Sequence, residues 1–129
     1  MRKFMTLDRY LYAIQALKKK YLCVRSVDVA HYMEVSKASV SLAVRQLREK
    51  GFLEVEPDGN LLYTAQGRDR VDLLNDRVDF FRRTLTDAGV EPSLAIQDAI
   101  SISWEMSEAS YEALRARMEA SERPPQGDQ

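Results

Sequence analysis

Apolar residues recur three and four positions apart through the first fifty residues of the chain, and this spacing predicts three amphipathic helices. Thr6, Ser26 and Ser36 stand where the N-caps of these helices are expected, because their hydroxyls can accept a hydrogen bond from a first helical turn. Gly51 follows the third helix, where a glycine favours termination. Only residues 34–36 separate the second helix from the third, and such a tight turn is typical of a helix-turn-helix.

The pattern then changes to two short apolar stretches, 52–56 and 61–64, around a turn that contains proline, aspartate and glycine. This arrangement predicts a β-hairpin. Helical spacing resumes after it, with Thr64 as the N-cap of a long helix, Pro92 in the first turn of a second and Ser107 as the N-cap of a third. Three helices followed by a hairpin form a winged helix-turn-helix, so the fold class expected is mainly α.

The apolar residues of the long helix follow a heptad spacing, which demands a partner along its whole length. We therefore expect a winged helix-turn-helix DNA-binding domain in residues 1–68 and a helical dimerisation region in 69–120. Residues 121–129 contain two prolines and no large apolar residue, which predicts a disordered tail. The residues expected at the homodimer interface are Val71, Leu74, Val78, Phe81, Leu85, Leu94, Ile100 and Trp104.

The net charge of −1 is unevenly distributed along the chain. Residues 1–50 hold 11 Lys/Arg against 4 Asp/Glu, and the remainder holds 8 against 16, so the two parts carry +7 and −8. A basic N-terminal part indicates a polyanionic partner such as double-stranded DNA. The first 22 residues have no long apolar run and the chain has one cysteine, Cys23, so we expect a cytoplasmic protein without disulfides or a paired-cysteine zinc site.

The third helix has the small and polar residues that a helix needs where it enters the DNA major groove. Lys37 and Arg45 can reach phosphates or guanine edges, and Ser39 and Ser41 can donate hydrogen bonds to phosphates, whereas Ser36 is mainly a helix cap. The residues expected to contact DNA are Arg25, Ser36, Lys37, Ala38, Ser39, Ser41, Leu42, Arg45, Asn60 and Arg68.

The hairpin leaves an alternative open, because Glu54, Glu56 and Asp58 repel phosphate. It can be a purely structural hairpin or a minor-groove reader, and an acidic wing would also suit a winged-helix module that binds protein. Neither His31 nor Cys23 has a catalytic partner near it in the sequence, so no catalytic residue and no enzyme activity are expected.

Five stretches resemble the family of diphtheria-toxin repressors and manganese-transport regulators, which are metal-dependent repressors. In order along the chain, the stretches are 8–14, 24–30, 35–41, 61–68 and 89–90. The resemblance runs from about residue 7 to residue 114. It implies a homodimeric repressor whose two recognition helices bind a palindromic operator.

The resemblance also implies a divalent manganese or iron ion, which clamps the DNA-binding part to the dimer part. In this chain the implied ligand positions hold Arg9, Tyr12, Val78, Ile100, Ser103 and Trp104. None of these is a usual ligand for such a cation. We therefore expect no metal ligands and no cofactor, and a regulator that binds DNA constitutively or responds to an unknown effector.

Two further interpretations concern the same positions. In the first, Arg9 replaces the metal charge by pairing with Glu105 or Asp79, and Trp104 and Tyr12 fill the vacated space. In the alternative, a shifted metal site uses Asp76, Asp79 or Glu105, and the protein remains responsive to manganese or iron.

Overall fold

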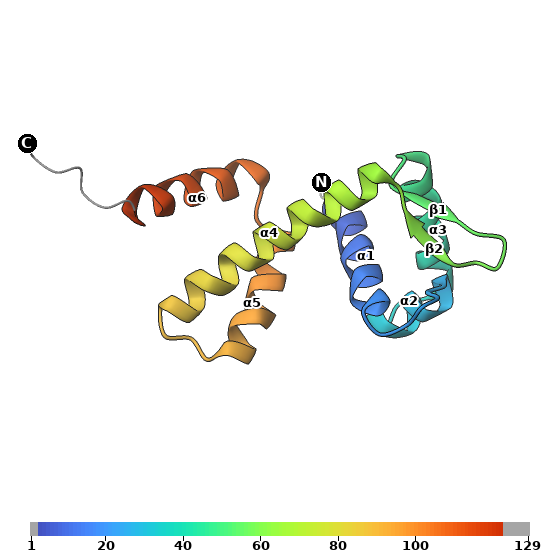
Figure 1. Ribbon diagram of the computed structural model, residues 1–129, viewed down its shortest axis with the longest axis horizontal. Helices are drawn as coiled ribbons and strands as arrows, with labels where there is room; N and C mark the ends of the chain where they lie inside the picture. Colours follow the sequence, from blue (N-terminus) through green and yellow to red (C-terminus); the bar gives the residue numbers. More distant parts are fainter. Residues whose placement is uncertain (1–2, 123–129) are drawn as a thin grey trace, which may run out of the picture. The chain divides into compact units, whose positions relative to one another are not determined.

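The first three helices pack against one another, and a two-stranded hairpin follows them, in a computed structural model that describes residues 3–122 and the side chains of residues 7–122 (Figure 1). The elements are α1 (Lys3–Lys18), α2 (Ser26–Met33), α3 (Lys37–Glu49), β1 (Leu53–Val55), β2 (Leu61–Tyr63), α4 (Ala65–Asp87), α5 (Pro92–Glu105) and α6 (Glu108–Glu122). The predicted winged helix-turn-helix followed by further helices is thus confirmed. The chain divides into two compact units, residues 1–76 and 77–129.

The core of the first unit lies among α1, α2 and α3. Leu11, Ile14, Val29, Val40 and Leu47 are completely buried, and they occupy the positions that the helical spacing assigned to the interior. Burying a large aliphatic side chain contributes about 1.5–3 kcal/mol, so this cluster is the main source of stability for the first unit. The core therefore holds α3 by one face only.

The helix starts agree with the sequence at α3 and differ at α1 and α2. Ser36 is the N-cap of α3. The helix α1 begins at Lys3, so Thr6 lies inside it and does not cap it. Arg25, not Ser26, is the N-cap of α2, because its backbone N–H donates to the Asp28 carboxylate at 2.8 Å and fixes the first turn one residue early.

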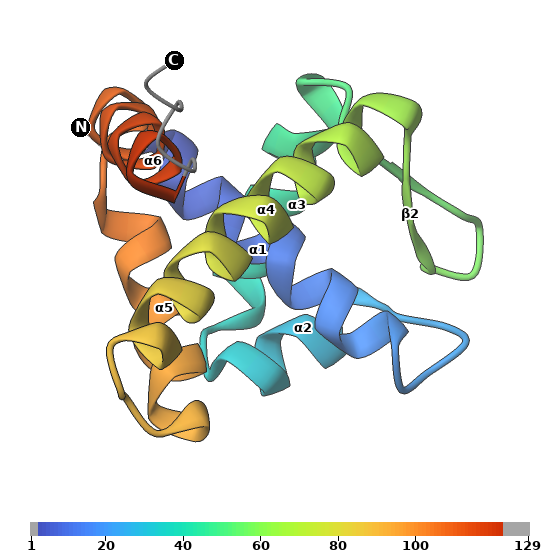
Figure 2. The same cartoon turned by 60° about the vertical axis from the view of Figure 1, so that its left-hand side comes forward.

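The hairpin projects from the three-helix core in both views (Figures 1 and 2). Its antiparallel register pairs Leu53 with Tyr63 and Val55 with Leu61. Gly59 has φ +93°, a left-handed conformation that glycine adopts without strain. The segment before α2 extends the hairpin, since the N–H of Leu61 donates to the carbonyl of Val24 at 2.8 Å.

Polar contacts attach the first half of α4 to α1. Arg70 forms two hydrogen bonds with the buried carboxylate of Asp8, at 2.6 and 2.9 Å. Gln15 and Asn75 exchange two amide hydrogen bonds of 2.8 Å. A bidentate arginine–carboxylate pair fixes both distance and orientation. These contacts therefore set the position of the first half of α4 relative to the core of the first unit.

The second unit contains the end of α4 together with α5 and α6. Phe80, Phe81 and Tyr111 form an aromatic cluster with ring centroids 5.2–5.8 Å apart, and all three are buried. Ser121 and Glu122, which the sequence assigns to a disordered tail, are instead the last residues of α6. Residues 123–129 of that predicted tail lie outside the described residues.

Candidate nucleic-acid interface

The helix α3 has one buried and one exposed face. Val40, Ala43, Val44 and Leu47 are at most 7% exposed and face the core. The opposite face carries most of the residues expected to contact DNA, and all of them are exposed: Lys37, Ala38, Ser39, Ser41, Leu42 and Arg45. The structure thus brings these side chains together on one outward surface, which we call the α3 face.

The first turn of α3 is closed by its cap. The Ser36 hydroxyl accepts a hydrogen bond from the backbone N–H of Ser39 at 3.0 Å and donates to the Ser39 hydroxyl at 2.9 Å. Such a cap stabilises a helix by about 1 kcal/mol. This exposed helix start carries the partial positive charge of the helix dipole, which suits a phosphate group.

Arg25 lies against the tip of the hairpin. Its guanidinium Nε donates to the carbonyl oxygen of Asp58 at 2.7 Å. Its side-chain carbons lie next to Gly59, where an added Cβ would come within 3.4 Å of Cδ. The exposed arginine therefore places a positive charge beside an acidic wing tip.

Asn60 has a structural role in addition to the DNA contact that the sequence predicts. It is 9% exposed, its Oδ1 accepts from the backbone N–H of Val24 at 2.9 Å, and its Nδ2 donates to Glu56 at 2.8 Å. One end of the amide thus bonds to the segment before α2 and the other to Glu56 in the hairpin, and the expected contact of Asn60 with DNA stays a prediction. It anchors the hairpin to the segment before α2.

Arg68 is exposed on α4, and its guanidinium carbon lies 4.8 Å from the centre of the Tyr63 ring. The Tyr63 hydroxyl donates to the carbonyl of Leu11 at 2.6 Å. Burial raises the pKa of Tyr63, and the charge of Arg68 opposes this effect, so the phenol remains a neutral donor. Tyr63 thus holds Arg68 near the hairpin through a cation–π contact.

The side chains at the implied metal-ligand positions do not form a suitable donor set. Burial raises the pKa of Tyr12, which disfavours the anionic form that binds cations. The Ser103 hydroxyl is completely buried and donates to the carbonyl of Ala99 at 2.7 Å. Val78 and Ile100 have no donor atom at all. The residues therefore do not fit a manganese or iron ion.

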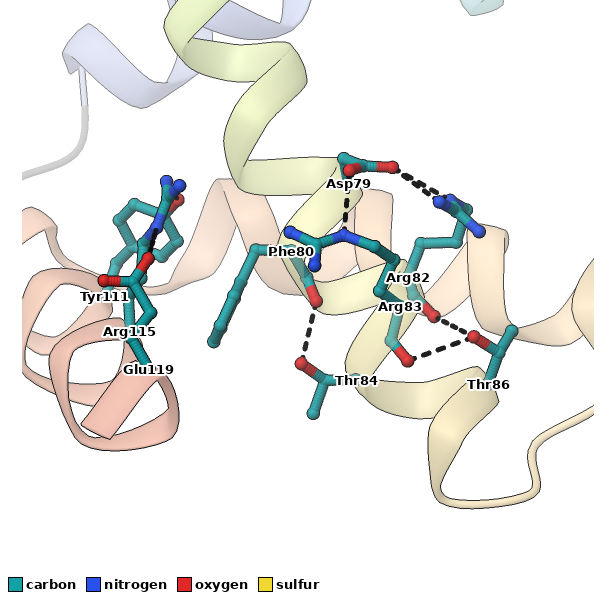
Figure 3. Close-up of polar contacts among 9 residues, drawn as sticks. All are labelled: Asp79, Phe80, Arg82, Arg83, Thr84, Thr86, Tyr111, Arg115 and Glu119. Carbon is teal, nitrogen blue, oxygen red and sulfur yellow. Dashed lines mark hydrogen bonds and ion pairs between the residues drawn. The ribbon is translucent and has the colours of Figure 1, made fainter. Parts of the chain in front are cut away.

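Asp79, a candidate for a shifted metal site, has its partners in its own helix (Figure 3). It forms ion pairs with Arg82 at 2.6 Å and Arg83 at 2.9 Å. The hydrogen bond from Arg82 is the main reason that the pKa of Asp79 lies below its usual value. The pairing of Asp79 with Arg9 that the sequence suggested stays a prediction, and no group of three His, Cys, Asp or Glu residues that could hold a metal ion gathers within the described part of the chain.

Arg77 is a functional candidate that the sequence reasoning missed. It is 5% exposed, and its guanidinium donates to the carbonyl oxygens of Ser103 at 3.2 Å and Ser107 at 3.1 Å. It also lies over the ring of Tyr111 at 4.6 Å. Its position three residues after Leu74 and four before Phe81 puts it on the buried side of α4, and this spacing was the available signal.

Many of the residues expected at a homodimer interface are already covered within the single chain. Val71, Leu74, Val78 and Phe81 are at most 4% exposed, and Trp104 is 8% exposed. Leu85 and Ile100 are half-buried, whereas Leu94 is 49% exposed. The apolar surface that remains for a partner therefore excludes the first residues of the heptad pattern, Val71, Leu74 and Val78, and includes Leu94.

Comparison with known proteins gives a consistent result. Residues 5–61 match the family model described as "Iron dependent repressor, N-terminal DNA binding domain". The chain is 28% identical over 109 residues to the transcriptional regulator MntR of Escherichia coli. These aligned residues make up 84% of this chain and 70% of that protein. None of the described helices combines the length and apolar character that a membrane span requires.

Solved structures show the same fold. A manganese-dependent transcriptional repressor in complex with manganese has a TM-score of 0.72 at 21% identity, over 95% of this chain and 56% of that one. T. acidophilum IdeR has a TM-score of 0.67 at 19% identity, over 87% and 53%. A hypothetical protein from Sulfolobus solfataricus has a TM-score of 0.64 at 16% identity, over 94% and 95%. The chain thus spans about half the length of the two repressors but almost all of the third protein.

Proposed function

We propose that this chain is a DNA-binding transcriptional regulator of the iron-dependent repressor family, whose model its residues 5–61 match, and that it represses transcription as a homodimer without a bound manganese or iron ion. In this proposal residues 1–68 bind DNA and residues 69–120 form the dimer. The two α3 helices enter successive major grooves of a palindromic operator, with half-sites about 10 base pairs apart or a multiple of that distance.

The α3 face is the observation that carries the proposal. It combines a capped helix start, small side chains that permit close approach to base edges, and the cations Lys37 and Arg45. Arg25, which contacts the hairpin at Asp58, and Arg68, which contacts it at Tyr63, provide further charge for phosphates. The acidic wing residues Glu54, Glu56 and Asp58 do not assist, so we assign the wing a supporting role.

The absence of suitable donors at the implied ligand positions supports metal independence. In the second unit a guanidinium, that of Arg77, bonds to the end of α5 and to the residue before α6. A permanently charged arginine needs no metal ion to supply positive charge there. We therefore propose that DNA affinity does not change with the concentration of manganese or iron.

The test begins by selecting bound sequences from a random duplex pool with the full chain. Affinity for the selected duplex is then measured by gel shift after EDTA treatment and after addition of manganese or iron. We expect the same dissociation constant under all three conditions. Loss of binding in EDTA that is restored by metal would disprove metal independence, and no salt-sensitive binding to any duplex would favour a protein-interaction module.

The salt dependence of binding tests the role of Arg45. Removing one phosphate contact lowers the slope of log K against log salt by about 0.9. We expect this decrease in Arg45→Ala, whereas Arg117→Ala, which removes the same charge from the exposed face of α6, leaves the slope unchanged. An unchanged slope in Arg45→Ala would remove this residue from the phosphate contacts.

A further inference from the structure

Leu42 is the one large apolar side chain on the α3 face. It is 47% exposed, although the apolar stripe of the same helix is buried on the opposite side. Ala38 lies one turn before it and Arg45 almost one turn after it, and both are exposed. An apolar strip of Ala38 and Leu42 therefore occupies the middle of the surface that faces DNA in the proposed function.

The chemistry of the major groove limits what such a side chain can recognise. Guanine, cytosine and adenine present hydrogen-bond donors and acceptors there, and thymine adds a 5-methyl group. Leucine has no donor or acceptor, so placing it against a polar base edge would strip water from that edge without replacing its hydrogen bonds. Contact with a methyl group instead buries two apolar surfaces together.

From this geometry we propose that Leu42 reads the 5-methyl group of one thymine in each operator half-site. The inference rests on the proposed DNA-binding function and adds a specificity-determining residue to it. Ala38 leaves space beside Leu42, and Arg45 fixes the position of the helix through the DNA backbone. Leu42 thereby selects thymine by apolar contact and rejects a G·C pair at the same position.

The experiment removes single methyl groups from the DNA. In the selected operator each thymine is replaced in turn by deoxyuridine, which keeps base pairing and lacks only the 5-methyl group. We expect one sensitive thymine in each half-site, at positions related by the symmetry of the operator. Deoxyuridine at either position should weaken binding of the parent protein about fourfold, because one buried carbon is lost. In Leu42→Ala, binding to the thymine operator is weaker, and deoxyuridine at that position has no additional effect.

Leu73→Ala is the matched control, because Leu73 is also an exposed leucine on a helix, at 58%, but lies on α4. This variant should retain the full sensitivity to deoxyuridine. Since Leu42 is exposed, Leu42→Ala should keep the thermal stability of the parent, which circular dichroism checks. The inference is overturned if no thymine is sensitive, or if Leu42→Ala retains the sensitivity; a protein that binds no duplex overturns the proposed function itself.

Discussion

At Gly67 the first turn of α4 passes so close to the hairpin that there is no room for a side chain. A Cβ added there would overlap the carbonyl oxygen of Phe52. The backbone at this glycine is helical, so the requirement for glycine is steric and not conformational. Thr64 strengthens the same junction, because its backbone N–H also donates to the Phe52 carbonyl, at 3.1 Å.

We predict that Gly67→Ala lowers the free energy of unfolding by about 1–3 kcal/mol, the usual cost of overpacking. The direction is informative, because alanine in an open helical position would raise stability by up to about 1 kcal/mol. Urea unfolding followed by circular dichroism measures the change. Asp69→Ala, an exposed position in the same turn, is the control and should change stability little. A Gly67→Ala protein as stable as the parent would refute the close contact.

A second prediction concerns Arg77. Replacing it with methionine removes the donors from two backbone carbonyls, one of them buried, and we expect a loss of about 2–3 kcal/mol. Arg77→Lys keeps the charge but not the planar fork, so it should recover only part of this stability. Thermal unfolding of the two variants and the parent decides. Equal stability of Arg77→Met and the parent would show that the guanidinium has no structural role.

Among the helices, α5 begins with a charged cap. The Glu91 side chain accepts hydrogen bonds from the backbone N–H groups of Ser93 and Leu94 and from the Ser93 hydroxyl, at 2.6–3.2 Å. These bonds, the one from the hydroxyl above all, lower the pKa of Glu91. A carboxylate whose folded-state pKa is lowered stabilises the folded protein above its unfolded pKa, and this contribution disappears as the pH falls.

We therefore predict that acid destabilises the parent more than it destabilises Glu91→Gln, which has no charge to lose. The difference in thermal unfolding temperature between the two proteins should be largest near neutral pH and should shrink as the pH falls through the usual glutamate range. A difference that is the same at neutral and acidic pH would contradict a charge-dependent cap.

At this scale the sequence predicted a feature correctly where that feature depends on one residue and its neighbours within a few positions. The cap of α3, the strands and the start of α5 at Pro92 are of this kind, and all are confirmed. The role of Asn60 was not predictable, because its partner Val24 lies 36 positions away and no local pattern connects them. The same reason hid the carbonyl partners of Arg77, which are 26 and 30 positions away.

For the whole molecule, the heptad spacing in α4 predicted that another segment covers this helix. The spacing could not show whether that segment belongs to a second copy of the protein or to the same chain. Burial of Val71, Leu74 and Val78 within one chain shows that part of the predicted seam is satisfied without a second copy. The α3 face, by contrast, follows directly from the spacing of its apolar residues. Surfaces could thus be predicted from the sequence more reliably than the partners that cover them.

We predict that the protein is a dimer and that Leu94 contributes to its interface, because this leucine remains 49% exposed. Leu94→Glu should weaken self-association tenfold or more, since a charge would be buried without a partner. Sedimentation velocity over a range of concentrations measures it. Ala116→Glu adds the same charge to an exposed position of α6 and should leave the dimer intact. A monomeric parent, or an unchanged Leu94→Glu, would exclude this interface.

Trp104 is the single tryptophan of the chain and lies buried on α5, in the second of the two compact units. Its indole fluorescence therefore reports the environment of that unit, whereas tyrosine emission comes mainly from residues 1–76, which hold five of the six tyrosines. If the two units open independently, selective excitation of the indole during denaturation will give a midpoint that differs from that of the tyrosine signal. One native chromophore thus makes the cooperativity between the two units measurable without any label.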